Sequence, residues 1–165
     1  LVGITGGMGS GKSALAQMLV ESGALRVDAD AVAREVAADA EVAARLLAAF
    51  GGDLRDGMGQ IDRRELGRRA FRTAEGSRRL EEIMRPPLAE AIECRLAAAE
   101  GVAAAAIVVF DAPLIFEWGT EGRCDRVVVV DAAEELRIER VRKRSGMAEG
   151  EIRERMARQM DPAQK

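Results

Sequence analysis

The sequence predicts an α/β fold in which a parallel sheet is covered by helices on both faces. Short apolar runs at residues 1–5, 24–27, 106–110 and 126–130 have the composition of buried strands. The segments between them carry helical periodicity, and this alternation is typical of parallel sheets. The first run leads directly into a glycine-rich turn and then a helical segment, which is the local order of a phosphate-binding strand–loop–helix unit.

The turn at residues 6–13 reads GGMGSGKS and fits the pattern of glycine, four residues, glycine, lysine, then serine or threonine. Glycines allow several backbone N–H groups to converge on one anion. Lys12 is expected to reach the β/γ-phosphate oxygens, and Ser13, at the start of the following helix, is expected to bind Mg²⁺. We therefore expect a nucleoside triphosphate bound by Gly7, Met8, Gly9, Ser10, Gly11, Lys12, Ser13 and Ala14.

The stretch between the second and third expected strands is too long for one crossover helix, so it predicts an inserted helical region over residues 31–103. An apolar stripe that includes Leu46 precedes a Gly51-Gly52 break, and Asp56-Gly57 with Gly59 predicts a turn. Asp62 and Glu65 resemble a capping box at the start of the next helix.

Later in this region, one helix is expected to end near Met84 and another to start at Pro86-Pro87, with Leu88, Ile92 and Leu96 facing inward until Gly101. Residues 103–106 are read as the end of that helix and the entry to the third strand.

An arginine-dense helical hairpin, broken at Gly146, follows the fourth strand. We expect most of its arginines to be solvated, with pairs such as Glu139 with Lys143. Arg140 and Arg144 are the candidates to approach the triphosphate and neutralise charge on the transferred group. The predicted organisation is one domain over residues 1–165, with a core at 1–30 and 104–135 and a lid at 136–160.

The composition is that of an ordinary enzyme, with 48% hydrophobic residues, 32% charged residues and a formal net charge of −3. It disfavours disorder and a general nucleic-acid surface. The longest uncharged apolar stretch is too short to cross a bilayer, so we expect a cytoplasmic protein with no membrane partner. Cys94 and Cys124 lack CxxC spacing, and without histidine the usual zinc clusters cannot form.

Ligands of doubly wound sheets bind beyond the carboxyl ends of the strands, where this chain has three aspartates. Asp28 and Asp30 follow the second strand, and Asp111 follows the third. A carboxylate after the third strand commonly orders Mg²⁺ or its waters, and one after the second can meet an acceptor hydroxyl. Helix N-capping is the alternative role for each of them.

Several motifs together resemble the dephospho-CoA kinase family over essentially the whole chain. They are the segment from Gly3 to Ser13, Val27-Asp28-Ala29-Asp30, residues 59–63, residues 79–83 followed by Pro86, Asp111-Ala112-Pro113-Leu114-Ile115-Phe116-Glu117, residues 125–131 and residues 155–159. The resemblance implies a P-loop kinase with an inserted helical substrate subdomain and a helical lid. It also implies ATP-dependent phosphorylation of the ribose 3′-hydroxyl of dephospho-CoA, the final step of coenzyme A biosynthesis.

The resemblance further implies roles for individual residues. Asp30 is the implied catalytic base, Lys12 holds phosphates, Arg140 belongs to the lid, and Ser13 with Asp111 holds Mg²⁺. The acceptor is expected between Asp30, the inserted region and the loop at 114–117. The expected acceptor-binding residues are Asp30, Arg63, Phe71, Arg85, Leu114, Phe116 and Glu117.

The chain departs from the family pattern at three places. Arg85 replaces the usual histidine before the first proline, which removes a proton-sharing side chain but keeps a cation. Ala14 replaces a hydroxyl residue that contacts the α-phosphate. The family continues past residues 161–165 into a last strand, an adenine-contacting loop and a terminal helix, so we expect this chain to be incomplete.

Other readings remain open at this point. One alternative is another small-molecule kinase, acting on a nucleoside monophosphate, a sugar acid or shikimate, and a second is an ATP-binding regulatory module without turnover. A regulatory GTPase is disfavoured because the sequence has no Asn-Lys-x-Asp or Thr-Lys-x-Asp segment. The oligomeric state is not indicated by the sequence.

Overall fold

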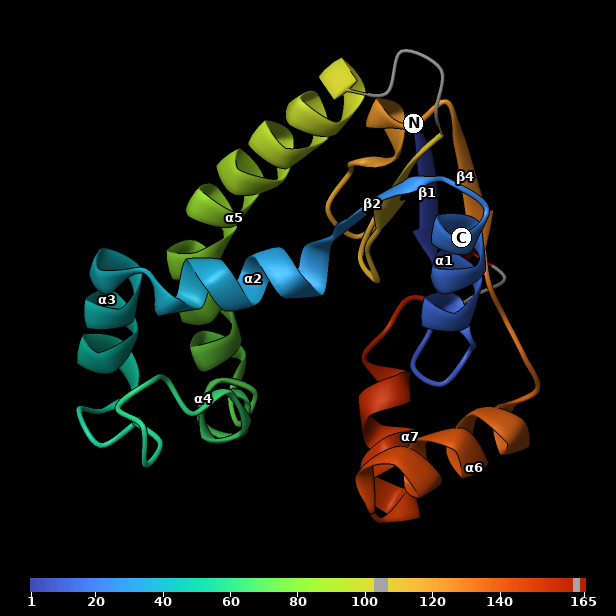
Figure 1. Cartoon of the computed structure of the whole chain (residues 1–165). Helices are drawn as coiled ribbons and strands as arrows, with labels where there is room; N and C mark the ends of the chain where they lie inside the picture. Colours follow the sequence, from blue (N-terminus) through green and yellow to red (C-terminus); the bar gives the residue numbers. More distant parts are fainter. Residues whose placement is uncertain (103–106, 162–163) are drawn as a thin grey trace. The chain divides into compact units, whose positions relative to one another are not determined.

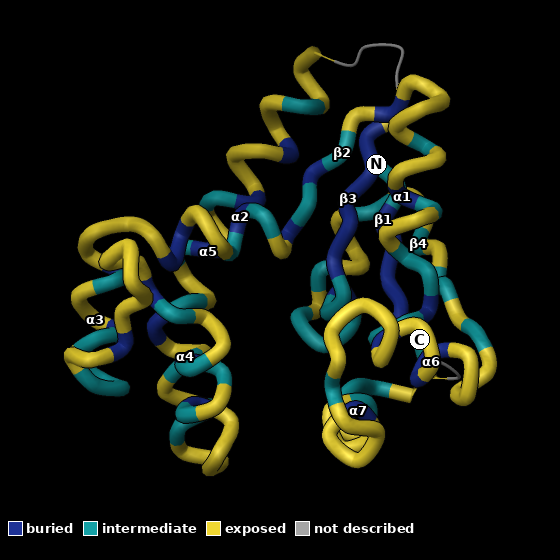
Figure 2. Tube along the Cα trace, turned by 60° about the horizontal axis from the view of Figure 1, so that its bottom comes forward, coloured by how far each residue is buried: buried dark blue, intermediate teal, exposed yellow. Residues whose placement is uncertain are grey.

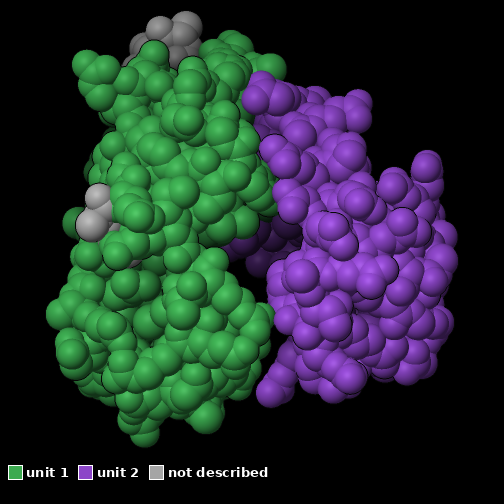
Figure 3. Space-filling model, turned by 180° about the vertical axis from the view of Figure 1, so that it is seen from behind, with its two compact units in different colours: residues 1–29, 96–165 green, residues 30–95 purple. Residues whose placement is uncertain are grey.

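The computed structural model describes residues 1–102, 107–161 and 164–165. They form two compact units, one of residues 1–29 and 96–165 and the other of residues 30–95 (Figure 3). The first unit contains the sheet, and the second is helical.

The sheet of the first unit has four parallel strands in the order β2-β3-β1-β4 (Figure 1). The strands are β1 (Val2–Thr5), β2 (Leu25–Asp28), β3 (Val108–Asp111) and β4 (Arg126–Val129). The predicted α/β class with a parallel sheet is confirmed. The expected start of the third strand at Ala106 lies outside the described residues, as does the Ala-rich run at 103–106.

Helix α1 (Lys12–Glu21) covers one face of this sheet, where Ile4 and Val109 pack with Ala16 and Ala24 of the helix and the turn after it. Successive side chains of a strand alternate between the two faces, so Gly3 belongs to the opposite face. There, a Cβ on Gly3 would lie 2.8 Å from Sγ of Cys124 and 3.0 Å from Ile115. The segment that carries these residues, including the short helix η1 (Glu121–Arg123), therefore packs directly on the backbone of β1.

Strand β3 is the centre of the core. All its residues are buried, and Figure 2 shows it buried along its length. Strands buried on both faces are apolar throughout, and β3 reads Val-Val-Phe before it ends in Asp111. The charged residue is therefore placed at the carboxyl end of the most buried strand.

The predicted hairpin is present as α6 (Glu134–Ser145) and α7 (Glu149–Ala157). Gly146 ends α6 in the left-handed conformation, with φ of 67°, as its position in the sequence indicates. The hairpin has its own small core of Ile138, Val141 and Ile152, and Met8 of the glycine-rich turn packs against it. The turn and the hairpin thus share one apolar cluster.

The second unit contains α2 (Ala29–Ala38), α3 (Ala40–Phe50), α4 (Arg63–Ala70) and most of α5 (Ala74–Val102). The predicted turn is confirmed, because Oδ1 of Asp56 accepts from the N–H groups of Met58 (2.9 Å) and Gln60 (3.0 Å). Asp62 caps α4 as expected, accepting from the N–H groups of Arg64 and Glu65.

Two local predictions in this unit are wrong. Glu65 does not complete a capping box, because its carboxylate pairs with Arg68 and Arg69, while the N–H of Asp62 donates to the carbonyl of Leu54. The expected helix break before Pro86 is also absent, since α5 runs continuously through Pro86 and Pro87. Prolines remove helix hydrogen bonds, but the buried face of Ile83, Leu88 and Ile92 continues across them and offsets this loss.

Candidate nucleotide-binding site

The carboxyl ends of the parallel strands bring the expected chemical groups of the first unit to one edge. Ile4 of β1 is in register with Asp111, and Asp28 of β2 is in register with the same Asp111. The glycine-rich turn, which we call the phosphate loop (residues 6–13), leaves β1 at this edge. The register therefore places Asp111 between the loop and Asp28.

The phosphate loop has a backbone that requires glycine at two points. Gly9 and Gly11 have φ of +79° and +106°, and Gly11 immediately precedes α1. Within the loop, the N–H of Ser10 donates to the carbonyl of Gly7 at 3.1 Å. Among the described residues, the N–H groups of Gly9, Gly11 and Ser13 have no acceptor. These groups are available to an anion at the start of α1.

Lys12 and Asp111 are the central charged pair of the site. The Lys12 ammonium is ion-paired with Oδ1 of Asp111, whose side chain is fully buried. Oδ2 of Asp111 accepts from Nε of Arg26 at 3.0 Å, and Nη2 of Arg26 donates to Asp28 at 2.9 Å. Both oxygens of the buried carboxylate thus face a cation, which satisfies the condition for burying a charge.

Ser13 and Ala14, both exposed, occupy the first turn of α1 beside this pair. Ser13 offers a hydroxyl oxygen and Asp111 a carboxylate oxygen, the ligands that Mg²⁺ prefers. The residues at this edge therefore fit the expected metal. The described residues contain no cluster of three or more acidic, cysteine or histidine side chains that could hold a metal ion by themselves.

The hairpin contacts the phosphate loop through side chains. Nε of Arg137 donates to the carbonyl of Met8 at 3.0 Å, and Oε1 of Gln159 accepts from the N–H of Met8 at 2.9 Å. Nη1 of Arg140 donates to the carbonyls of Ser10 (3.1 Å) and Gly9 (3.3 Å). Arg140, predicted to approach the triphosphate, is therefore beside the loop, whereas Arg144 is exposed near the end of α6.

The segment after β3 carries three expected acceptor residues, Leu114, Phe116 and Glu117, all half-buried. Oε1 of Glu117 pairs with the ammonium of Lys165 at 2.8 Å. Oε2 of Glu117 is buried and has no hydrogen-bond partner among the described residues. Thr5, at the end of β1, donates to the carbonyl of Pro113 at 3.0 Å and fixes the start of this segment.

The remaining candidates lie in the second unit. Asp30 is exposed in the first turn of α2, Arg63 is exposed at the start of α4, and Phe71 is 51% exposed directly after α4. Arg85 pairs with Glu81 one turn earlier on α5, at 3.1 Å. The second unit contains none of the phosphate-loop residues, which all lie in the first unit.

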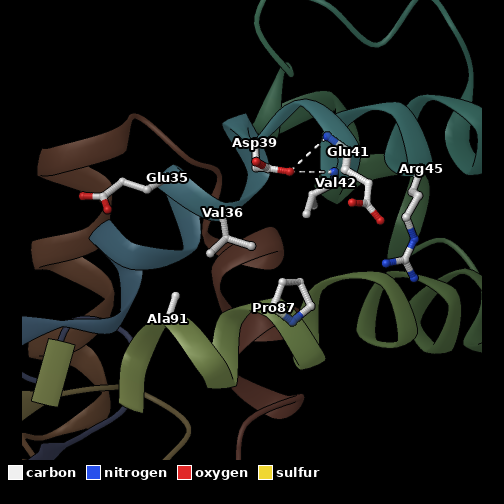
Figure 4. A pocket seen from close by; sticks show the side chains of 8 residues that line it. All are labelled: Glu35, Val36, Asp39, Glu41, Val42, Arg45, Pro87 and Ala91. Atoms are coloured by element: carbon white, nitrogen blue, oxygen red, sulfur yellow. Dashed lines mark hydrogen bonds between the residues drawn. The ribbon is translucent and has the colours of Figure 1, made fainter. Parts of the chain in front are cut away.

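The second unit also has a pocket of about 370 Å³ between α2, α3 and α5 (Figure 4). Three of its lining side chains are acidic, namely Glu35, Asp39 and Glu41, and Arg45 is the single lining cation. Asp39 caps α3 by accepting from the N–H groups of Glu41 and Val42. The charge of this pocket is unfavourable for phosphate groups, so it does not complete a nucleotide site.

Three residues that contact the site were not singled out from the sequence: Arg26, Arg137 and Gln159. Arg26 lies two positions before Asp28 on the same strand and therefore on the same face, a spacing that could have revealed it. Arg137 lies one helical turn before Arg140 and was indistinguishable from the surrounding solvated arginines.

Comparison with known proteins then decides the family. A family model described as CoaE, dephospho-CoA kinase, matches residues 1–165. The chain belongs to the dephospho-CoA kinase family. The resemblance inferred from the motifs is thereby confirmed.

Two curated members of the family are similar to almost the whole chain. The dephospho-CoA kinase of Corynebacterium jeikeium is 42% identical over 163 residues, which cover 98% of this chain and 83% of that protein. The dephospho-CoA kinase of Dechloromonas aromatica is also 42% identical over 163 residues, covering 96% of this chain and 76% of that protein.

Solved structures share the fold. The crystal structure of TT1252 from Thermus thermophilus has a TM-score of 0.82 at 34% identity and covers 99% of this chain and 81% of that chain. A dephospho-CoA kinase from Campylobacter jejuni has a TM-score of 0.67 at 21% identity, covering 94% and 78%, and supports the fold alone. Within the described part of this chain, no helix combines the length and apolarity needed to span a membrane.

Proposed function

We propose that the chain transfers the γ-phosphate of ATP to the ribose 3′-hydroxyl of dephospho-CoA, the final step of coenzyme A biosynthesis. Membership of the family supports the reaction. The observation in the structure that carries it is the phosphate loop, which combines N–H groups that have no acceptor among the described residues with Lys12, ion-paired to the buried Asp111 at one edge of the sheet. We place the reaction in the cytoplasm, as the composition predicts.

The loop residues have a physical role in this reaction. The N–H groups of Gly9, Gly11 and Ser13 would bind phosphate oxygens at the positive end of α1. Phosphoryl transfer requires mainly positioning and charge stabilisation, so fixed N–H groups contribute without reorganisation. Lys12 would exchange its partner Asp111 for phosphate oxygens when the nucleotide binds.

Mg²⁺ is proposed as the metal of the reaction, held by Ser13 and Asp111. Bound there, the ion would neutralise negative charge on the phosphates. Arg26 keeps one oxygen of Asp111 oriented, and Asp28 holds Arg26 in turn. These residues remain available to position the carboxylate whether or not the ion is bound.

Asp30 is proposed as the general base that accepts the proton of the acceptor hydroxyl. The expected acceptor residues, Arg63, Phe71, Arg85, Leu114, Phe116 and Glu117, stay predictions, as do Arg140 and Arg144 as ligands of the triphosphate. The division into a core at 1–30 and 104–135, an acceptor region at 31–103 and a lid at 136–160 is proposed on the same basis. Arg85 is exposed and can offer a cation to an anionic acceptor.

The deciding experiment is incubation with ATP, Mg²⁺ and dephospho-CoA, followed by mass spectrometry of the acceptor. The expected result is a gain of one phosphate, lost in Lys12→Ala. A parallel panel of nucleoside monophosphates, shikimate and sugar acids tests the acceptor, and faster transfer to any of these would overturn the assignment. Binding of ATP without consumption in every mixture would instead support a regulatory module.

The base assignment has its own test. Asp30→Asn should lower transfer by roughly 10²-fold or more, as expected for a general base. Glu35→Gln, which changes a carboxylate on the same helix α2, is the matched control and should stay near the unmodified rate. Near-normal transfer by a folded Asp30→Asn protein would show that Asp30 is not the base.

A further inference from the structure

The phosphate loop is held from its carbonyl side by two arginines of α6. Arg137 donates to the carbonyl of Met8 and Arg140 to that of Ser10. The two arginines lie one helical turn apart, and Arg140 also donates to the carbonyl of Gly9. Helix α6 therefore binds three consecutive carbonyls of the loop, those of Met8, Gly9 and Ser10.

Each carbonyl that is held in place also fixes the direction of the N–H group in the same peptide. In a trans peptide the C=O of one residue and the N–H of the next lie in one plane and point in opposite directions. The carbonyl of Met8 shares its plane with the N–H of Gly9, and the carbonyl of Ser10 shares its plane with the N–H of Gly11. These two N–H groups are among those without an acceptor in the described residues.

Arg137 is the more firmly fixed of the two arginines. It is only 8% exposed, and its Nη1 lies 3.6 Å from Oδ1 of Asp131, the second residue after the end of β4. Its Nη2 fills the space beside Gly7, where a Cβ would lie 2.3 Å away. Arg140 is exposed and reaches the loop through Nη1 alone.

Gln159 and the Met8 side chain complete the arrangement. Gln159 accepts from the N–H of Met8, so both backbone polar groups of Met8 are bound, one by α6 and one by the segment directly after α7. The side chain of Met8 packs on the hairpin core. Rotation of the Met8–Gly9 peptide would therefore break contacts to the hairpin.

We propose that Arg137 is a positioning residue for nucleotide binding: by holding the Met8 carbonyl, it aims the Gly9 N–H at the nucleotide phosphates. The inference rests on the proposed binding of ATP to this loop. It separates Arg137 from Arg140, which the sequence pointed to as a direct ligand of the triphosphate. A group that only orients the loop stabilises the enzyme–nucleotide complex and the transition state equally. Its loss should therefore raise KM for the nucleotide and leave kcat unchanged.

The test measures nucleotide affinity of the whole chain without any acceptor, by calorimetric titration with ADP and with ATP. Arg137→Met should weaken both by roughly tenfold or more, because one hydrogen bond to a charged group loses its alignment. Arg142→Met, an exposed arginine on the same helix, is the matched control and should bind as the unmodified chain does. In the transfer assay, KM for ATP should rise with kcat within about threefold.

Two further variants keep the test decisive if Arg137→Met fails to fold. Gly7→Ala retains the guanidinium but pushes it from its place, because the added Cβ would overlap Nη2. It should weaken nucleotide binding in the same direction, and where Arg137→Met folds, the two effects should not add. Arg137→Lys keeps one donor for the Met8 carbonyl and should restore part of the affinity.

Unchanged nucleotide affinity in folded Arg137→Met would overturn the proposal, as would a fall in kcat with no change in affinity. If Arg142→Met weakened nucleotide binding equally, the effect of Arg137→Met would come from the loss of one positive charge and not from the contact with the Met8 carbonyl. These outcomes are independent of the acceptor, so failure to phosphorylate dephospho-CoA would remove the proposed reaction and leave this inference intact. Failure of the unmodified chain to bind either nucleotide would remove both.

Discussion

The ammonium group of Lys12 is ion-paired with the buried carboxylate of Asp111. The residue expected to bind phosphate is thus already bound to an anion of the protein. Asp111 also accepts from Arg26, so the two cations share one carboxylate. A nucleotide must compete with Asp111 for Lys12. When Lys12 moves to the phosphates, Asp111 loses one of its two cations, so nucleotide binding changes the charge at this edge of the sheet.

Asp111→Asn should destabilise the nucleotide-free protein, because it removes the counter-charge of the poorly exposed Lys12 and leaves Arg26 paired with only Asp28 of the two carboxylates. Breaking a buried pair in this way costs roughly 3–5 kcal/mol in unfolding free energy. ATP should stabilise the variant more than the unmodified protein, since its phosphates replace the lost charge. Urea denaturation with and without ATP measures both effects. Glu139→Gln, which breaks an exposed pair with Lys143, should change little.

Arg26→Met should make stability depend on Mg²⁺. The change removes the guanidinium shared by Asp28 and Asp111, which lie at neighbouring positions, while Asp111 keeps its pair with the Lys12 ammonium. Two neighbouring carboxylates that lose a shared cation attract a divalent ion more strongly, so millimolar Mg²⁺ should raise the melting temperature of this variant more than that of the unmodified chain. Arg26→Lys retains the charge and should respond as the unmodified chain does. An equal response of Arg26→Met would contradict this account.

The sequence predicted the parts of the fold that depend on local pattern. The phosphate loop was predicted because its spacing is strict, and the strands because their apolar runs are bounded by turns. Gly146 predicted the hairpin break for a similar reason, since a left-handed residue favours glycine. In each case a few consecutive residues determine the local backbone conformation.

The sequence predictions were wrong or incomplete where contacts between residues far apart in the chain determine the structure. Pro86 and Pro87 predict a helix start by local rules, but the apolar face of α5 continues through them. Arg137 could not be separated from its neighbours because its role depends on the carbonyl of Met8, 129 residues away in the sequence. Such a contact has no counterpart in the local pattern of charges.

Gly9→Ala should destabilise the protein more than Gly23→Ala. Both glycines have positive φ, so alanine costs roughly 1–2 kcal/mol at either position. A Cβ at Gly9 would also lie 2.5 Å from the backbone oxygen of Arg137, whereas nothing lies within 4 Å of one at Gly23. Gly9→Ala should therefore also weaken ATP binding by displacing α6, while Gly23→Ala should not. Denaturation and calorimetry measure the two quantities, and equal stability losses would argue against close contact between α6 and the loop.

Acid should weaken the second unit through Arg69. Hydrogen bonds from Arg69 lower the pKa of Asp53 to about 2, and those from Arg68 and then Arg69 lower the pKa of Glu65 to about 2. In the unfolded chain these carboxyls titrate near 3.8 and 4.5, so the unfolded state binds more protons as the pH falls. Their stabilising contribution is complete above about pH 4.5 and is lost between that pH and about pH 2.

Arg69→Gln should remove much of this acid sensitivity, because Asp53 loses its donor and Glu65 keeps only Arg68. Urea denaturation followed by far-ultraviolet circular dichroism from pH 6 to pH 2 measures the change. The variant should be less stable than the unmodified chain at pH 6, and the difference should shrink toward pH 2. Arg64→Gln alters an exposed arginine on the same helix and should preserve the unmodified pH dependence. A constant difference between Arg69→Gln and the unmodified chain across this range would show that Arg69 acts through packing and not through the two carboxylates.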